Sequence, residues 1–244
     1  SYVQPVLVGK KEKVEELAQP LFLNVSGIEF VDHENYEKYD EMVAKFVERR
    51  AGKVNEEKAR ELLQDVNYFG TMLVYMGEVE GLVSGAIHST GDTVRPALQI
   101  IKTKPGVSRT SGAFIMSRNA SRFIFADCAI NTSIDAQGLA EIAVESAKTA
   151  KAFNINPKVA MLSFSTYGSA KTEETLKVAE ATRLVREKAP TLPVGGEMQF
   201  DAAYVPPVAK LKAPNSEIQG DANVFVFPSL EAGNIGYKIA ERSE

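Results

Sequence analysis

Short apolar runs that alternate with helix-like segments constrain the fold of this chain most. Three runs rich in Val, Ile and Phe lie in its second half, at Arg122–Asp127, Val159–Ser163 and Asn223–Phe227. Such runs are typical of strands that are buried on both faces, as in parallel sheets. Apolar residues at helical spacing lie between them, around Leu139–Ala147 and Val178–Val185, and Glu173 and Lys177 are expected to form a surface ion pair in the second stretch. This alternation predicts an α/β fold with largely parallel sheets packed between helices.

The first half gives a less regular pattern of expected elements. We expect helices through Tyr39–Val47, after the capping residue Asn55, and over Thr93–Lys102, and short strands at Tyr2–Val8, Thr71–Met76 and Gly81–Ile87. The Pro105–Gly106 pair predicts a hinge. We therefore expect two domains, at residues 1–106 and 107–244.

Composition excludes several classes of protein. The 244 residues carry a net charge of −4 with both signs interspersed, so no broad basic surface suggests a nucleic-acid partner. No apolar run approaches the roughly 20 residues of a membrane helix. A signal-peptide pattern is not seen at the start, and the single cysteine, Cys128, excludes an internal disulfide framework. We expect a soluble cytoplasmic protein that binds neither membrane nor nucleic acid.

Three segments rich in small polar residues follow apolar runs and are candidate ligand loops. They are Ser84–Pro96, Ser163–Lys171 and Pro228–Asn234. Ligands of open parallel sheets bind outside the carboxyl ends of the strands, where hydroxyls and free backbone N–H groups can hold an anion. Arg95 and Lys171 add positive charge. Gly and Ser also occur in such loops simply as turn and capping residues, so the spacing alone leaves both interpretations open.

Longer residue strings resemble a known family. The strings GAIHST, DTVRPA, QIIKTKPGV, FADCA, KVAMLSFST, GEMQFDAA and GNIGYKIA begin at Gly85, Asp92, Gln99, Phe125, Lys158, Gly196 and Gly233. Together with shorter matches between about Val31 and Glu241, they resemble the phosphate acetyl/butyryltransferase family, and within it the bacterial acetyltransferases.

The resemblance implies both a fold and a reaction. Family members have two α/β/α domains around a cleft, as in isocitrate and isopropylmalate dehydrogenases, and usually form homodimers. They transfer acetyl reversibly between acetyl-CoA and phosphate, giving acetyl phosphate and CoA, by direct attack of the CoA thiolate in a ternary complex. No metal or redox cofactor is implied. The substrates and partners expected are therefore acetyl-CoA, CoA, phosphate, acetyl phosphate and a second copy of the chain.

The resemblance also assigns substrate-binding residues. Arg95 would grip the phosphate group, since a guanidinium at a helix start is unfavourable without an anion nearby. Arg49 falls where the family has another substrate-linked arginine, and a solvated helix end is its alternative. The remaining candidates, which would line the cleft or order its loops, are His88, Ser89, Thr90, Ser165, Thr166, Gly168 and Ser169. We expect His88 to orient the Ser89–Arg95 loop rather than to act as a base.

Other polar residues receive structural interpretations or none. Cys128 lies in an apolar strand pattern and is expected to be buried and not catalytic. Asp127 is expected on the cleft side, and Asp201 as a helix N-cap. No catalytic residue is assigned, because the family's Asn-Asp-Leu-Ser-Arg-Gly motif and following aspartate, which carry the thiol-activating base, would lie beyond Glu244. The chain is thus expected to lack parts of the first domain at both ends.

Three alternative functions remain at this point. A phosphate butyryltransferase would share the mechanism and differ in the acyl pocket. A non-catalytic, acetyl-CoA-sensing domain of the same family is a different class of protein. A dehydrogenase would follow from fold similarity alone, but the chain has no G-x-G-x-x-G after a predicted strand.

Overall fold

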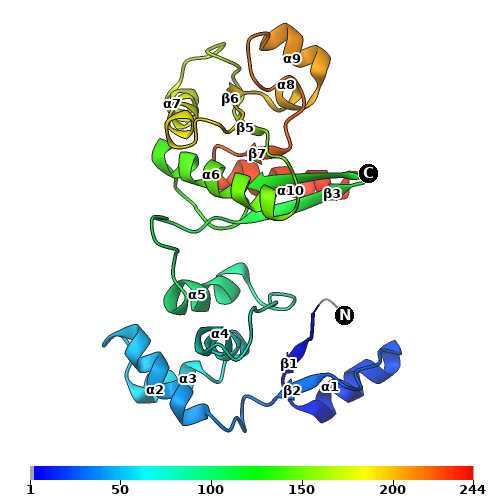
Figure 1. Ribbon diagram of the computed structural model, residues 1–244, viewed down its shortest axis with the longest axis vertical. Helices are drawn as coiled ribbons and strands as arrows, with labels where there is room; N and C mark the ends of the chain where they lie inside the picture. The colour runs from blue at the N-terminus through cyan, green and yellow to red at the C-terminus, as the bar shows by residue number, and fades with distance from the viewer. Residues whose placement is uncertain (1–2, 244) are drawn as a thin grey trace. The chain divides into compact units, whose positions relative to one another are not determined.

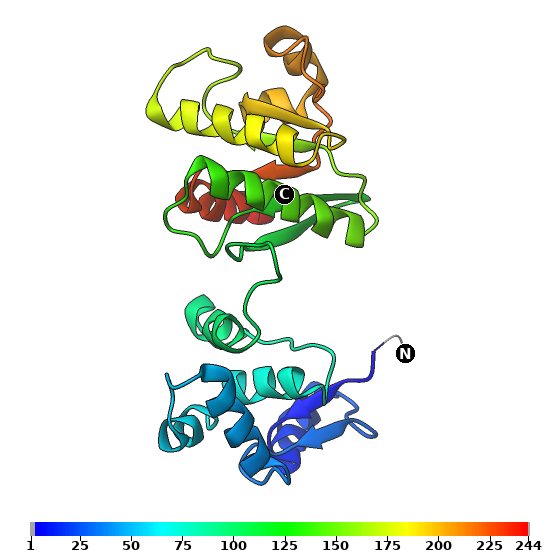
Figure 2. The ribbon, with the colours of Figure 1, turned by 60° about the vertical axis from the view of Figure 1, so that its left-hand side comes forward.

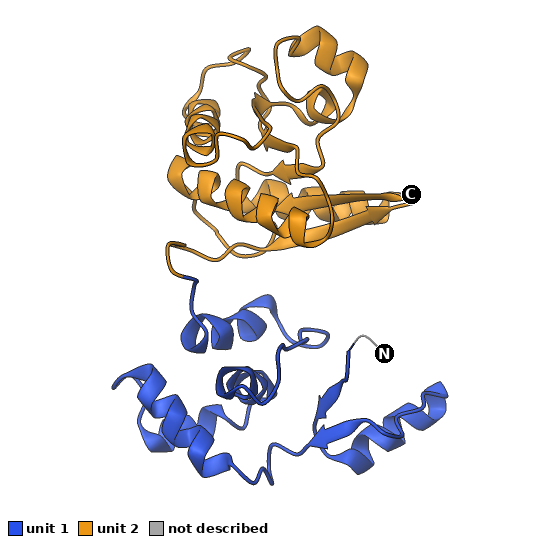
Figure 3. Cartoon of the chain, viewed as in Figure 1, with its two compact units in different colours: residues 1–104 blue, residues 105–244 orange. Residues whose placement is uncertain are grey.

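The computed structural model describes residues 3–243 and divides into two compact units, residues 1–104 and 105–244 (Figure 3). The division falls two residues before the boundary expected from Pro105–Gly106. Each unit has a core of its own and is described by itself.

Unit 1 is mainly helical. Its elements are β1 (Val6–Val8), α1 (Lys11–Ala18), the 3₁₀ turn η1 (Gln19–Leu21), β2 (Glu29–Val31), α2 (Tyr39–Arg50), α3 (Glu56–Leu62), α4 (Val66–Met76) and α5 (Thr90–Ile100). The strands β1 and β2 pair in parallel, with Val6 opposite Glu29. Helices α2 to α5 enclose an apolar core that includes Phe46, Phe69 and Ile100, none of which is exposed.

Two strand predictions for unit 1 are wrong. The Thr71–Met76 run belongs to α4, whose N-cap Asp65 accepts hydrogen bonds from the N–H groups of Asn67 and Tyr68 at 2.8 and 3.2 Å. An apolar run inside a buried helix has no polar face, so its sequence resembles a buried strand. The Gly81–Ile87 segment is loop, and Val83 within it is fully exposed. No strand pairs with it among residues 3–243, and a strand without a partner leaves its backbone groups unpaired.

Unit 2 is a five-stranded α/β unit. Its elements are β3 (Ala113–Arg118), β4 (Ser121–Ala126), α6 (Ala136–Ala152), β5 (Val159–Leu162), α7 (Glu173–Lys188), β6 (Val194–Met198), α8 (Phe200–Tyr204), α9 (Pro206–Lys212), β7 (Val224–Val226) and α10 (Leu230–Arg242). The strand order is β3-β4-β7-β5-β6. β3 runs antiparallel to β4, whereas the other pairs are parallel. The three buried strands expected in this half are confirmed.

Helices cover both faces of this sheet (Figures 1 and 2), and alternate residues of β4, β5 and β7 pack against opposite layers. Ile124, Met161 and Val226 pack with α6 and α7, whereas Phe125 and Phe225 pack on the other side with α8 and its neighbours. This period of two is what an extended chain imposes on its side chains. The inner strands of the sheet are therefore buried on both faces, as their apolar runs predict.

The order of crossovers creates a crevice at the carboxyl edge of this sheet. The chain leaves β4 and β5 toward α6 and α7 on one face, but leaves the strand between them, β7, toward α10. Helix α10 contacts β3 and β4, and its Tyr237 stacks on Phe114 with ring centroids 4.4 Å apart. Such a reversal leaves the strand ends uncovered, and open α/β sheets bind ligands at that point.

Two smaller predictions for unit 2 are also wrong. Gln199, not Asp201, is the N-cap of α8, and the Asp201 carboxylate instead pairs with Lys212 at 2.8 Å. Lys177 pairs with Glu174, one turn away at 2.6 Å, rather than with Glu173. In both cases two acidic or polar neighbours compete for one position, and the sequence pattern fits either.

Candidate active site

The start of α5 combines a capped helix end with unused backbone donors. Ser89 is the N-cap: its hydroxyl oxygen accepts from the N–H of Asp92 at 3.1 Å and donates to the Asp92 carboxylate at 2.7 Å. Among the described residues, the N–H groups of Thr90 and Gly91 have no hydrogen-bond acceptor. A helix N-terminus with free N–H groups and a positive dipole end favours an anion.

Arg95 turns back toward this helix start. Its Nη1 lies 3.3 Å from Asp92 Oδ1, and its side chain is 58% exposed. A Cβ atom placed on Gly91 would lie 3.8 Å from both Arg95 Nη2 and Ser89 Oγ. The guanidinium, the hydroxyl and the free N–H groups therefore border one small space. The structure thus brings together three residues expected to bind substrate, Ser89, Thr90 and Arg95.

Arg49 belongs to α2 and contacts the C-terminal end of α5. Its Nε donates to the carbonyl of Ile100 at 2.5 Å and its Nη2 to that of Ile101 at 3.0 Å. The neighbouring Arg50 donates to the carbonyl of Gln99 at 3.1 Å. Cations stabilise the negative end of a helix dipole, and these carbonyls have no partners within the helix. Arg49 is thus committed to holding α5, and its predicted contact with substrate stays a prediction.

His88 does not order the loop before α5 in the expected way. Its imidazole is half-buried and makes no hydrogen bond to any other described residue. The segment is held instead by the Ser89 cap and by Thr93, whose hydroxyl and N–H donate to the Ser89 carbonyl at 3.0 and 3.1 Å.

Most backbone N–H groups of the loop after β5, residues 163–171, already have hydrogen-bond acceptors within the protein. The predicted site residues lie in this loop, but their donors are already used. The N–H groups of Thr166, Tyr167, Gly168, Ser169 and Ala170 donate to Ser169 Oγ, Glu197 O, Glu197 Oε1, Thr166 O and Ser165 Oγ at 3.0, 2.9, 2.6, 3.2 and 3.0 Å. Ser165 is fully buried and Thr166 is 6% exposed. A substrate cannot take these donors without breaking internal bonds.

Asp127 is wrongly predicted as a group open to the cleft. It is 5% exposed, and its Oδ1 accepts from the N–H groups of Gly112, Ala129 and Ile130 at 3.0, 3.0 and 3.1 Å. Its Oδ2 accepts from the N–H of Asn131 at 2.9 Å. A carboxylate that satisfies several backbone donors is a structural anchor, because removing it would leave those donors buried and unpaired.

Cys128 is buried, as expected. Burial, and to a smaller extent the neighbouring Asp127 carboxylate, raise the pKa of its thiol to about 12. The thiolate is the nucleophilic form of cysteine, so a thiol with this pKa is unreactive near neutral pH.

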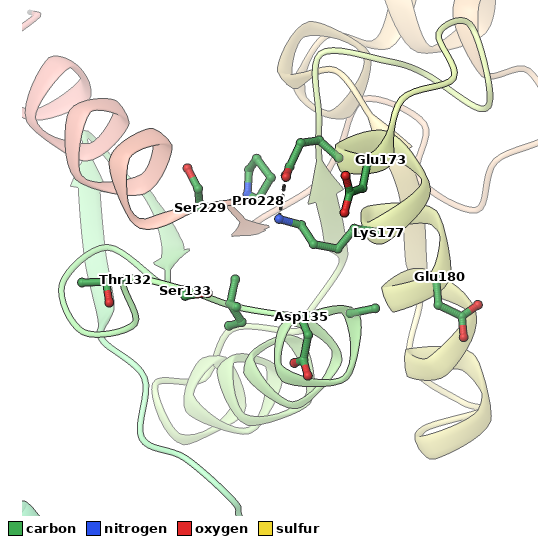
Figure 4. Close-up of a pocket in the computed structure, with 11 residues that line it drawn as sticks. Thr132, Ser133, Asp135, Glu173, Lys177, Glu180, Pro228 and Ser229 are labelled. Atoms are coloured by element: carbon green, nitrogen blue, oxygen red, sulfur yellow. Dashed lines mark ion pairs between the residues drawn. The ribbon is translucent and has the colours of Figure 1, made fainter.

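The crevice of unit 2 holds a pocket of about 850 Å³ (Figure 4). Its walls come from the segments after β4, β5 and β7, including Asp135, Glu173 and Ser229. The lining includes four carboxylates, those of Asp135, Glu173, Glu174 and Glu180, and one ammonium group, that of Lys177, which already pairs with Glu174. This charge repels phosphate groups, in contrast to the start of α5.

Arg109 and Glu197 are residues whose roles the sequence does not suggest. The Arg109 guanidinium lies beside the start of α6, with Nη2 3.7 Å from Asp135. Glu197, at the end of β6, supports the loop after β5. Arg109 lies in a polar segment and Glu197 in a short strand that the sequence does not predict, and the role of each becomes visible only from its three-dimensional neighbours. Residues 3–243 contain no group of three or more His, Cys, Asp or Glu placed to hold a metal ion. Within the same residues, no helix combines the length and apolar character needed to span a membrane.

Comparison with known proteins gives consistent matches over the whole chain. The family model described as phosphate acetyl/butaryl transferase matches residues 1–244. A phosphate acetyltransferase of Bacillus subtilis (strain 168) is 62% identical over 240 residues, which are 98% of this chain and 74% of that protein. A phosphate acetyltransferase of Staphylococcus aureus (strain Mu50) is 63% identical, over 99% of this chain and 75% of that protein.

Solved structures match as well. A phosphotransacetylase from Staphylococcus aureus superposes with a TM-score of 0.88 at 63% identity, over 99% of this chain and 74% of that one. A phosphotransacetylase from Streptococcus pyogenes gives 0.90 at 55% identity, over 98% and 73%. A branched-chain phosphotransacylase from Enterococcus faecalis gives 0.59 at 19% identity, over 98% and 84%, a likeness of fold alone.

Proposed function

Because this chain belongs to the phosphate acetyl/butaryl transferase family, we propose that it transfers acetyl reversibly between acetyl-CoA and inorganic phosphate, giving acetyl phosphate and CoA. The observation that carries this proposal is the identity of 62–63% to curated phosphate acetyltransferases across nearly the whole chain. Sequence identity at this level, spread over both units, supports a shared activity. Fold similarity alone would not, because one fold occurs in many proteins of unrelated function.

The start of α5 is the phosphate site in this proposal. The free N–H groups of Thr90 and Gly91, the Ser89 hydroxyl and the Arg95 guanidinium border one space. A phosphate there would receive charge-assisted hydrogen bonds from a planar guanidinium and from a helix N-terminus. It would also relieve the unfavourable position of a cation near the positive end of α5.

The chemical step is direct acyl transfer in a ternary complex. The thiolate of CoA attacks the carbonyl carbon of acetyl phosphate, a carbon–sulfur bond forms, and the carbon–oxygen bond to phosphate breaks as inorganic phosphate leaves. Holding both anionic substrates together supplies proximity, and fixed positive groups stabilise the charge that moves onto oxygen. Cys128 takes no part, because its raised pKa keeps the thiol protonated.

Three further expectations accompany this proposal. The family resemblance implies a homodimer, which light scattering on the purified protein would test. A single, buried and unpaired cysteine is consistent with a reducing cytoplasm. We expect no dependence on a metal ion or redox cofactor, so dialysis against a chelator should leave the rate unchanged.

The direct test is phosphate-dependent release of free CoA thiol from acetyl-CoA. Activity should require phosphate and give acetyl phosphate in equal amount. Butyryl-CoA in the same assay compares the acyl preference: a faster rate with butyryl-CoA would reassign the substrate within the family. No thiol release by the full-length protein with either acyl-CoA would reject the proposal.

A further inference from the structure

Glu197 is a buried carboxylate that the proposed reaction does not use. It lies at the end of β6 and is 4% exposed. Its Oε1 accepts from the hydroxyl of Ser165 at 3.1 Å and from the N–H of Gly168 at 2.6 Å. The backbone carbonyl of the same residue accepts from the N–H of Tyr167 at 2.9 Å. One residue therefore fixes three points of the loop that follows β5.

Burying the Glu197 carboxylate in this way costs folding free energy. No lysine, arginine or histidine among the described residues lies within ion-pairing distance of Glu197, so only neutral donors compensate its burial. Burying a charged group without a counter-ion costs several kcal/mol in general, and hydrogen bonds from neutral donors repay part of that. An apolar or amide side chain could fill the same space at lower cost.

The loop itself adopts a conformation that must be held. Tyr167 and Gly168 both have left-handed backbones, with φ of 46° and 82°. For a residue with a Cβ atom this region is unfavourable by roughly 1–2 kcal/mol. Glu197 binds the N–H groups of both residues, and the Tyr167 hydroxyl also accepts from the N–H of Gly196 at 3.2 Å. Strained backbone that its surroundings hold in place gathers at ligand sites.

The outward side of the loop is available to a substrate. Phe164 is 61% exposed, and Gly168 and Lys171 are also exposed. With its N–H groups bound internally, the loop offers an aromatic ring, a bare glycine surface and one ammonium group. These suit the apolar arm and the phosphates of an acyl-CoA better than a small inorganic anion.

The geometry points to Glu197 as a positioning residue for acyl-CoA: its carboxylate holds residues 165–168 in the shape that presents Phe164, Gly168 and Lys171 to that substrate. The assignment rests on the proposed function, because the loop has a substrate only if the protein transfers acyl groups. Glu197 acts through the loop and does not touch the reacting atoms.

Two variants of the full-length protein, Glu197→Gln and Glu197→Ala, test this role. The amide oxygen of Gln can still accept from Ser165 and Gly168, whereas Ala cannot. We expect Glu197→Ala to raise the KM for acetyl-CoA about tenfold, roughly the cost of one lost positioning contact, while the KM for phosphate stays within about twofold. Glu197→Gln should recover most of the lost affinity. A merely destabilised enzyme would instead lose active fraction, hence kcat, without this split.

Amide hydrogen exchange separates this inference from the proposed function. In Glu197→Ala the amide of Gly168 should lose protection because its acceptor is the carboxylate, whereas the amide of Tyr167, which donates to the main-chain carbonyl of residue 197, should lose less and those of β5 should keep it. The matched control is Thr182→Val, at a buried polar residue whose hydroxyl donates to the Val178 carbonyl at 2.9 Å and to no residue of the loop; this variant should leave the loop protected. Unchanged protection in Glu197→Ala, or equal KM values for all variants, would overturn the inference. A wild-type enzyme without transferase activity would reject the proposed function, and the exchange result would still decide whether Glu197 holds the loop.

Discussion

The segments before α5 and after β5 have similar compositions and opposite structures. Both are rich in Ser, Thr and Gly, and both precede a helix. At α5 the N–H groups of Thr90 and Gly91 have no acceptor among residues 3–243, and the exposed Arg95 guanidinium lies near Gly91. After β5, every N–H group from Thr166 to Ala170 donates to an acceptor within the protein.

The difference shows that small polar residues identify a loop but not its use. Free donors at a helix start are ready for an anion, whereas satisfied donors make a rigid support. Substitutions at the first segment should therefore change substrate binding with little effect on stability. Substitutions at the second should do the reverse, unless they displace the whole loop.

Among substitutions in these two segments, Arg95→Ala should lower kcat/KM for phosphate most. Losing a charged partner of the phosphate costs at least about 2 kcal/mol of transition-state binding, or about a 30-fold fall in kcat/KM for phosphate. Stability should change little, because an exposed ion pair such as that with Asp92 contributes about 0–1 kcal/mol. Steady-state kinetics with phosphate and acetyl phosphate, together with thermal unfolding, give both values.

The matched control for Arg95 is Arg60→Ala. Arg60 is another exposed arginine of unit 1 and pairs with Asp40 and Glu56, both at 2.8 Å. It should leave phosphate kinetics unchanged. An Arg95→Ala enzyme with wild-type phosphate kinetics would remove Arg95 from the site.

Gly91→Ala places a methyl group in the space where we propose that phosphate binds. The new Cβ would lie 3.8 Å from Arg95 Nη2 and Ser89 Oγ, an ordinary van der Waals contact that requires no shift of either side chain. Alanine in place of a helical glycine stabilises by up to about 1 kcal/mol, so the melting temperature should not fall. The KM for phosphate should rise about tenfold, corresponding to about 1.4 kcal/mol. A stable variant with unchanged KM would move the phosphate elsewhere.

Thr166→Val tests the loop after β5 in the opposite direction. The Thr166 hydroxyl accepts from the N–H of Gln199 at 3.0 Å and donates to its side-chain oxygen at 3.3 Å. Valine keeps the shape and removes both bonds, which should cost about 1 kcal/mol of unfolding free energy. Both KM values should stay within about threefold of wild type. A large change in KM with unaltered stability would mean that this hydroxyl binds substrate directly.

The sequence predicts most of unit 2 and much less of unit 1. The runs around Ile124, Met161 and Val226 predict a buried sheet, because strands that are buried on both faces consist almost entirely of apolar residues. The Thr71–Met76 run fails because a buried helix is apolar on all sides, so the sequence shows no helical period. The residue strings identify the family. Whether a backbone N–H group is free or hydrogen-bonded, however, depends on partners that are distant in the sequence. Glu197 is 29 residues from the Gly168 N–H group that it accepts from.

Cys128→Ala should have the smallest effect on activity, because this side chain is buried in the core of unit 2 and does not lie beside a substrate. The pKa of the thiol is raised from 9.0 to about 12, mainly by burial. A folded-state pKa above the unfolded value means that the thiol's contribution to stability is fully present below about pH 9 and is lost as the pH rises toward 12. The wild type should therefore lose stability relative to Cys128→Ala over this interval, while both proteins keep the same kcat near neutral pH. A thiol reagent should modify unfolded protein and spare the native state, since only the thiolate reacts and it is scarce there. Rapid modification of native protein that also abolishes activity would place Cys128 in the open site, beside the substrates.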